Sequence, residues 1–193
     1  MPNKLPYSTS FTALGLEPMQ FLEVCRVLEE SGSSDSVLKD LTESVRSSTH
    51  NRKMREYSKR WEALSQEEKD ILFTGDSIEV RGIAYLSVVK TYRLIGRFVI
   101  EGVLPLFYSS NTEITHKHYD DYFNKVAIEY PAMRNMSDRT YKNSRNRVFK
   151  ILKDAGIITG NKTMSVSSFY PGARLVQHLN KEHPHYLKFF LLK

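Results

Sequence analysis

The stretch SDRTYKNSRNRVFKILKDAGIITGNKTMSV, residues 137–166, decides the fold of this chain. Ser137 is a residue type that caps helix N-termini and Gly156 is the type that ends helices, so the residues between them predict one helix. After Gly156 apolar and polar residues alternate, and the Gly-Asn-Lys sequence at 160–162 is typical of a turn. The stretch therefore predicts a helix followed by a small β-hairpin.

At 100° per residue, the predicted helix separates apolar from cationic side chains. Its apolar face holds Tyr141, Val148, Leu152 and Ala155, with Ile151 beside them. Its opposite face holds Arg139, Lys142, Lys150 and Lys153, with Arg147 nearby. One face is therefore expected to pack on the protein core, while the other offers cations to a partner.

The apolar residues in most of the remaining chain also recur with the period of a helix. The predicted helices cover residues 17–30, a segment that begins after Ser33-Ser34, 51–64, 65–74, 77–107 as two helices or one kinked helix, 115–130, 137–155 and 172–180. A helix, a short turn, a second helix and a hairpin are the order of a winged helix-turn-helix, whose second helix enters a major groove. We expect a mainly α fold, with an N-terminal helical bundle at 1–110 and a winged helix-turn-helix-like domain at 111–193.

Positive charge is concentrated in two parts of the chain. Residues 139–162 contain seven Lys or Arg and one Asp, a net charge of +6 that equals the charge of the whole chain. Residues 46–60 contain six Lys or Arg and one Glu, so everything outside the two segments carries a net −5. Concentrated positive charge attracts polyanions, of which nucleic acid is the commonest in a cell.

The candidate binding residues come from these two basic segments. The predicted nucleic-acid contacts are Arg139, Lys142, Asn143, Asn146, Arg147, Lys150 and Lys162 in the first, and Arg52, Lys53, Arg55 and Lys59 in the second. Asn side chains can address base edges, and Arg can form paired hydrogen bonds to guanine. Glu56 is spaced to pair with Arg52 and Arg60, so part of the second segment's charge is expected to be compensated. The alternative for both segments is a solvated basic helix face without a ligand.

The composition excludes several classes of protein. Cys25 is the single cysteine, which excludes an intrachain disulfide framework and a multi-cysteine zinc site. The apolar stretch 81–110 contains four Lys or Arg residues, and each costs about 2.5–3.5 kcal/mol at the centre of a bilayer, so we expect buried core there rather than a membrane span. Cysteine poverty and the lack of an apolar run after Met1 favour the cytoplasm.

Motifs for catalysis or metal binding are not found in the sequence. Two His-x-His pairs, at 116/118 and 183/185, lack a third ligand at metal-binding spacing. A phosphate-binding glycine loop, a nucleophile elbow and a zinc-hydrolase motif are all absent from the sequence. We therefore expect no metal, no cofactor and no catalytic residue.

Three segments together resemble a known family. They are YSTSFTALGL, RGIAYLSVVKTYRLIGRFVIEGVL and HYDDYFNKVAIEYPAMRNMSDRTYKNSRNRVFKILKDAGII, and they follow one another over nearly the whole chain. They are similar to BrxA, the small protein of the bacteriophage exclusion (BREX) defence systems of bacteria. The resemblance implies a cytoplasmic helical protein of a multi-protein system that methylates host DNA and blocks phage replication. It also implies a fold that has been compared with NusB, an RNA-binding antitermination factor, and DNA binding has been proposed for the family.

Charge and resemblance together predict a non-enzymatic DNA-binding accessory protein of a BREX system. Its expected partners are duplex DNA and other BREX proteins. Two alternatives remain: an RNA-binding protein of the NusB kind, and a protein–protein scaffold whose basic faces meet acidic partners.

Overall fold

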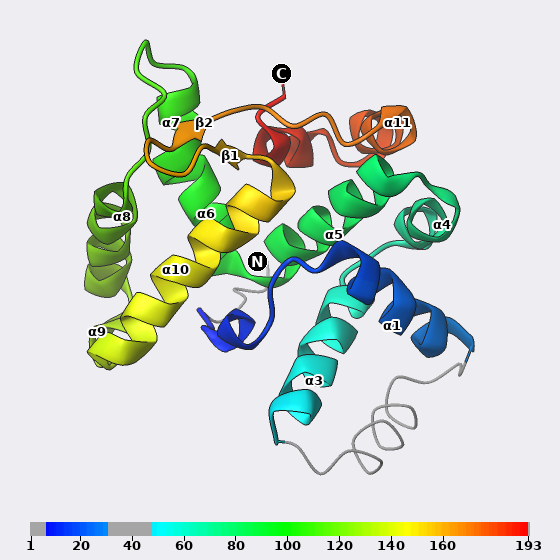
Figure 1. Cartoon of the computed structure of the whole chain (residues 1–193), viewed down its shortest axis with the longest axis horizontal. Helices are drawn as coiled ribbons and strands as arrows, with labels where there is room; N and C mark the ends of the chain where they lie inside the picture. The colour runs from blue at the N-terminus through cyan, green and yellow to red at the C-terminus, as the bar shows by residue number, and fades with distance from the viewer. Residues whose placement is uncertain (1–6, 31–47, 193) are drawn as a thin grey trace.

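The computed structural model describes residues 7–30 and 48–192, which form a mainly α-helical protein, as the sequence predicts (Figure 1). The helices of its first half are η1 (Ser10–Ala13), α1 (Pro18–Glu30), α3 (Ser48–Glu62), α4 (Gln66–Thr74), α5 (Ser77–Thr91) and α6 (Arg93–Phe98). Those of its second half are η2 (Val99–Val103), α7 (Leu104–Phe107), α8 (His116–Glu129), α9 (Pro131–Arg134), α10 (Asp138–Ala155), α11 (Ala173–Glu182) and η3 (Pro184–Phe190). The helix expected after Ser33-Ser34 lies outside the described residues.

Local signals in the sequence set both ends of α10 and the start of α4. The Ser137 hydroxyl accepts a hydrogen bond from the Thr140 backbone N–H at 3.3 Å, which caps the start of α10. Gly156, with φ at 85°, ends this helix in the left-handed conformation that favours glycine. Ser65 and Glu68 form a capping box at the start of α4, with each side chain bonded to the other residue's backbone N–H.

The apolar stretch at 77–107 forms a chain of helices rather than one straight helix. α5 ends at Thr91, Tyr92 is extended, α6 begins at Arg93, and the π-helix η2 leads into α7. α5 is the central helix of the fold and packs against α1, α3, α4, α6, α10 and α11. Among the described residues, no helix combines the length and hydropathy needed to cross a bilayer.

The hairpin predicted after Gly156 is confirmed. Its strands β1 (Ile158–Thr159) and β2 (Ser165–Val166) pair antiparallel, and β1 packs next to α10. Lys162 lies in the exposed turn between the two strands. The sequence order of helix, turn, helix and hairpin is therefore present in α8, α9, α10 and β1–β2.

Aromatic packing joins the two halves of the chain. The ring of Phe98 in α6 lies 5.1 Å from that of Tyr119, 5.3 Å from that of Tyr122 and 6.2 Å from that of Phe149. The Tyr122 hydroxyl also donates to the backbone oxygen of Leu94 at 2.8 Å. The core thus continues across the boundary expected near residue 110, and the division into two domains stays a prediction.

Candidate nucleic-acid interface

The two faces of α10 separate as its sequence period predicts. Its buried side holds Val148, Phe149, Ile151, Leu152 and Ala155. Its exposed side holds Arg139, Lys142, Asn143, Asn146 and Lys150, with Arg147 half-buried at its edge. The same helix therefore anchors itself in the core and presents cations and carboxamides to solvent.

A cleft of about 600 Å³ lies between α10, α3 and η1. Its lining consists of Asn143, Asn146, Arg147 and Lys150 from α10, Arg52 from α3 and Thr12 from η1. Figure 1 shows the short N-terminal helix between the lower half of α10 and α3. The cleft therefore brings together the two basic segments that the sequence places about 90 residues apart.

The cleft is strongly cationic because its charges have few counterions. In the part of the chain that the structure describes, neither Arg52 nor Arg147 has a carboxylate within ion-pair distance. The Arg52 guanidinium donates instead to the Thr12 hydroxyl at 3.4 Å. Lys150 pairs with Asp154 at 3.1 Å, but exposed i,i+4 pairs of this kind contribute little and are easily rearranged.

The other predicted residues of α3 do not line the cleft. Lys53 lies 3.6 Å from the Glu17 carboxylate, and Lys59 lies 2.7 Å from that of Glu56. Arg55 is exposed to solvent. Of the four predicted contacts in this segment, the structure brings only Arg52 to the α10 row.

The expected pairing of Glu56 with Arg52 and Arg60 is wrong. Glu56 is buried and accepts hydrogen bonds from Lys59, from the Tyr92 hydroxyl at 2.6 Å and from the Ser10 hydroxyl at 2.9 Å. The packing of η1 and α5 against α3 buries a carboxylate that the helix period alone places away from the core. Glu56 therefore ties η1 to α3 instead of neutralising arginines.

Arg60 is completely buried and is not part of any surface patch. Its guanidinium donates to the backbone oxygens of Gly15, Leu16 and Ala84 and to the Ser87 hydroxyl, at 3.0–3.3 Å. Burial lowers its pKa. Arg60 therefore holds in place the chain that directly follows η1, the helix whose Thr12 lines the cleft.

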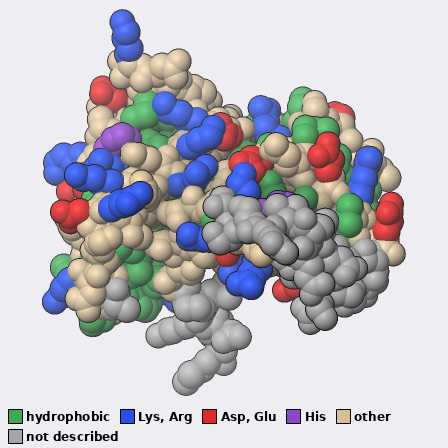
Figure 2. Space-filling view, turned by 60° about the horizontal axis from the view of Figure 1, so that its bottom comes forward, with side chains coloured by type: hydrophobic (Ala, Val, Ile, Leu, Met, Phe, Trp, Pro, Cys, Tyr) green, Lys and Arg blue, Asp and Glu red, His purple; other side chains and the backbone are tan. Residues whose placement is uncertain are grey.

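The remaining basic residues of the first segment have different surroundings. Arg145 forms two hydrogen bonds of 3.0 Å to Asp120 of α8, so its charge is compensated within the fold. Arg139 and Lys142 are exposed on α10 outside the cleft, and Lys162 is exposed on the hairpin. In Figure 2, Lys and Arg side chains gather on the left half of the molecule, which is the half that contains α10 in Figure 1.

Thr12 is the cleft residue that sequence reasoning missed. It lies in a four-residue 3₁₀-helix, Ser10–Ala13, that contains no Lys or Arg, so neither charge nor periodicity in the sequence marks it as a binding residue. Its place in the cleft depends on contacts of η1 with both α3 and α10, which are distant in sequence.

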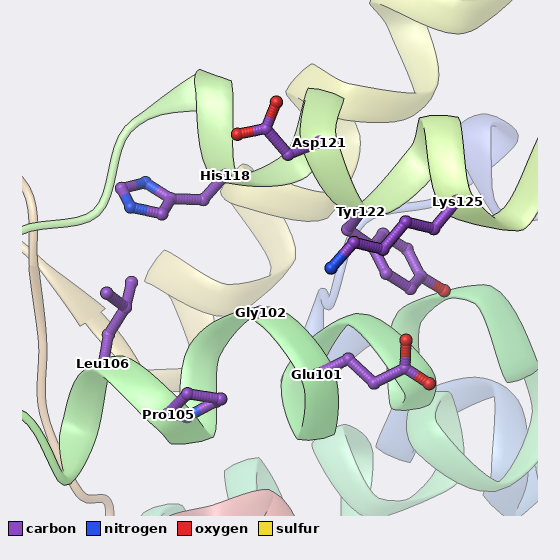
Figure 3. A pocket seen from close by; sticks show the side chains of 8 residues that line it. All are labelled: Glu101, Gly102, Pro105, Leu106, His118, Asp121, Tyr122 and Lys125. Atoms are coloured by element: carbon purple, nitrogen blue, oxygen red, sulfur yellow. The ribbon is translucent and has the colours of Figure 1, made fainter.

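A second, smaller pocket of about 220 Å³ lies between α8 and the η2–α7 segment (Figure 3). Two of the polar residues on its α8 side already have partners: Asp121 pairs with Lys117, and the His118 ring accepts from the Thr115 backbone N–H at 3.0 Å. Within the described ranges, no three or more His, Cys, Asp or Glu side chains are grouped to hold a metal ion. This pocket is a weaker candidate site than the cationic cleft.

Comparisons with known proteins identify the family. The family model described as BrxA matches residues 5–183. No curated protein matches the chain. The crystal structure of an uncharacterized protein from Magnetospirillum magneticum is similar, with a TM-score of 0.82 and 20% identity over 96% of this chain and 98% of that chain, and this likeness shows the fold alone. Because the family model covers nearly its whole length, this chain belongs to the BrxA family and is a protein associated with BREX defence.

Proposed function

We propose that this BrxA protein is a non-enzymatic accessory factor that binds duplex DNA through the cleft and the exposed face of α10. One observation carries the proposal: Arg52 and Arg147, from basic segments far apart in sequence, line the same cleft, and no carboxylate is among its lining residues. A basic helix face that only contacts solvent would not require cations from two distant segments to line one cleft. Phosphate contacts would supply most of the affinity, and sequence preference would be slight.

The lining favours duplex DNA over single-stranded RNA. Proteins that bind single strands stack bases on exposed aromatic rings. The two aromatic residues of α10 are not available for stacking, because Phe149 is buried and the Tyr141 hydroxyl bonds to Asp120. RNA binding of the NusB kind is therefore the second candidate.

The winged helix-turn-helix order adds a further proposed contact. In that arrangement the hairpin lies beside the recognition helix and touches the DNA backbone. Lys162, exposed in the hairpin turn, would make this contact, and Arg139 and Lys142 would extend the positive surface along α10.

Binding of a fluorescent duplex, measured by anisotropy at several salt concentrations, tests the proposal. With about five phosphates neutralised, the slope of log Kobs against log salt should be roughly −4 to −5. The double variant Lys142→Glu/Arg147→Glu should weaken binding about 10-fold or more. A control of equal charge change, Lys117→Glu/Lys181→Glu, alters exposed lysines on α8 and α11 and should have a much smaller effect.

The same variants separate DNA binding from a scaffold role. If the Lys142→Glu/Arg147→Glu variant loses the pull-down of other BREX proteins while its affinity for duplex DNA is unchanged, the scaffold function is correct. A salt-independent signal, or equal losses of affinity in this double variant and the control, would also contradict the proposal.

A further inference from the structure

We infer that the cleft holds the sugar–phosphate backbone of one strand of the duplex, so that α10 lies along a backbone instead of inside a major groove. This inference rests on the proposed DNA binding and specifies how the DNA is held. It starts from the position of the α10 residues Asn143, Asn146, Arg147 and Lys150, which are spaced three and four residues apart on one side of the helix.

These side chains lie in a recess and not on a free ridge. Thr12 of η1 and Arg52 of α3 line the same cleft, and η1 contacts both helices. A helix with its side chains is about 10–12 Å across, and the major groove of B-DNA is about 12 Å wide. There is no room in such a groove for η1 and α3 next to α10, so this row of side chains cannot reach base edges by groove insertion.

The chemistry of the lining matches phosphate groups. Two guanidinium groups, one ammonium group, two carboxamides and one hydroxyl can all donate hydrogen bonds. Phosphate oxygens only accept hydrogen bonds, and charge-assisted bonds to them are the strong ones. Because no aromatic ring lies among the lining residues, a stacked base is a poorer fit than a backbone.

The length of the row sets the expected footprint. From Asn143 to Lys150 the helix rises by about 10 Å, at about 1.5 Å per residue. One strand of B-DNA carries a phosphate about every 3.4 Å along the axis, so the row spans about three phosphates of one strand.

Internal contacts fix η1 and the chain that follows it beside the cleft. The Ser10 hydroxyl donates to Glu56, and Arg60 fixes the backbone at Gly15 and Leu16. A side chain at Gly15 would place its Cβ 3.5 Å from the Arg147 guanidinium, which shows how closely this segment lies against α10. A preformed cleft avoids the entropy cost of ordering these groups upon binding.

A duplex whose major groove is blocked by a bulky group at every cytosine tests the inference, whichever base pairs the protein contacts. The probes are a plain duplex and the same duplex with every cytosine replaced by 5-(glucosyloxymethyl)cytosine, which places a sugar in the major groove. Backbone binding predicts dissociation constants that agree within about 2-fold and equal salt slopes. A loss of 10-fold or more on the glucosylated duplex would mean that α10 enters the groove, and would overturn the inference.

A variant on η1 provides the second readout. Thr12→Asp places a carboxylate in the cleft from a segment that a recognition helix would not use, and should weaken binding to both duplexes about 5-fold or more. Asn180→Asp, on the exposed side of α11, is the control with the same charge change and should leave binding within about 2-fold. Unaltered binding by Thr12→Asp would contradict the inference. Failure of the wild-type protein to bind either duplex at low salt would instead contradict the proposed function itself.

Discussion

Replacing Arg60 with methionine should destabilise the protein without removing any charge from its surface. The change removes the donors of five hydrogen bonds. Ala84 keeps a partner, because the Ser87 hydroxyl donates to its backbone oxygen at 2.7 Å. The backbone oxygens of Gly15 and Leu16 lose the donors that Arg60 supplies, and each buried unsatisfied group costs about 1–3 kcal/mol.

The free energy of unfolding should therefore fall by about 3 kcal/mol, which lowers Tm by about 6–12 °C for a chain of this size. Urea unfolding monitored by the fluorescence of Trp61, the single tryptophan and the next residue in α3, measures the change directly. Because Gly15 and Leu16 follow η1, we also expect weaker DNA binding by the fraction of protein that remains folded.

The control is Arg55→Met, which removes an exposed arginine from the same helix and should change stability by about 0.5 kcal/mol or less. Replacing a buried charge with an apolar side chain is sometimes neutral or stabilising, because it also removes a desolvation cost. If Arg60→Met is as stable as the wild-type protein, the carbonyl oxygens have found other donors and the assigned role of Arg60 is wrong.

Three further outcomes follow from individual residues. Burial raises the pKa of the Cys25 thiol to about 12, so a thiol reagent at pH 8 should react only after unfolding, and rapid labelling of folded protein would contradict its placement. Gly156→Ala should cost about 1 kcal/mol in urea unfolding because φ there is 85°, and Gly156→Asn should cost less. Burial alone would raise the pKa of the Glu56 carboxyl, but hydrogen bonds from Lys59 and Tyr92 hold this pKa below its ordinary 4.5. As pH falls, Glu56 is therefore protonated in the unfolded chain before it is protonated in the folded protein. Its contribution to stability is present above about pH 4.5 and is lost as pH falls through the folded pKa. Glu56→Gln should reduce this acid dependence, and an unchanged pH profile would refute the assignment.

Local signals predicted much of the fold. The start and end of α10 and the hairpin after it depend on caps, turn residues and a change of period within about 30 residues, and all of them are confirmed. The exposed face of α10 followed from the same period. Such features require only contacts between neighbours in the sequence, which is why a single sequence contains them.

The cleft could not be predicted, because it is built by contacts between distant segments. Arg60 looked like one cation among several, although on a helical wheel it lies about 40° from the buried Leu64, which was a usable signal of burial. Glu56 and Thr12 gave no such signal, since η1 covers the first and positions the second. Contact of DNA with the predicted residues and the division into two domains stay predictions, and the backbone contact inferred for the cleft replaces the expected entry of α10 into a groove.

The way in which the cleft is assembled has a consequence for protein synthesis. Its lining comes from residues 12, 52 and 143–150, so a nascent chain lacks the complete surface until about three quarters of it has left the ribosome. Neither basic segment alone reproduces the arrangement. We therefore expect the nascent chain not to bind chromosomal DNA during most of translation. It should gain affinity only when α10 packs against η1 and completes the cleft.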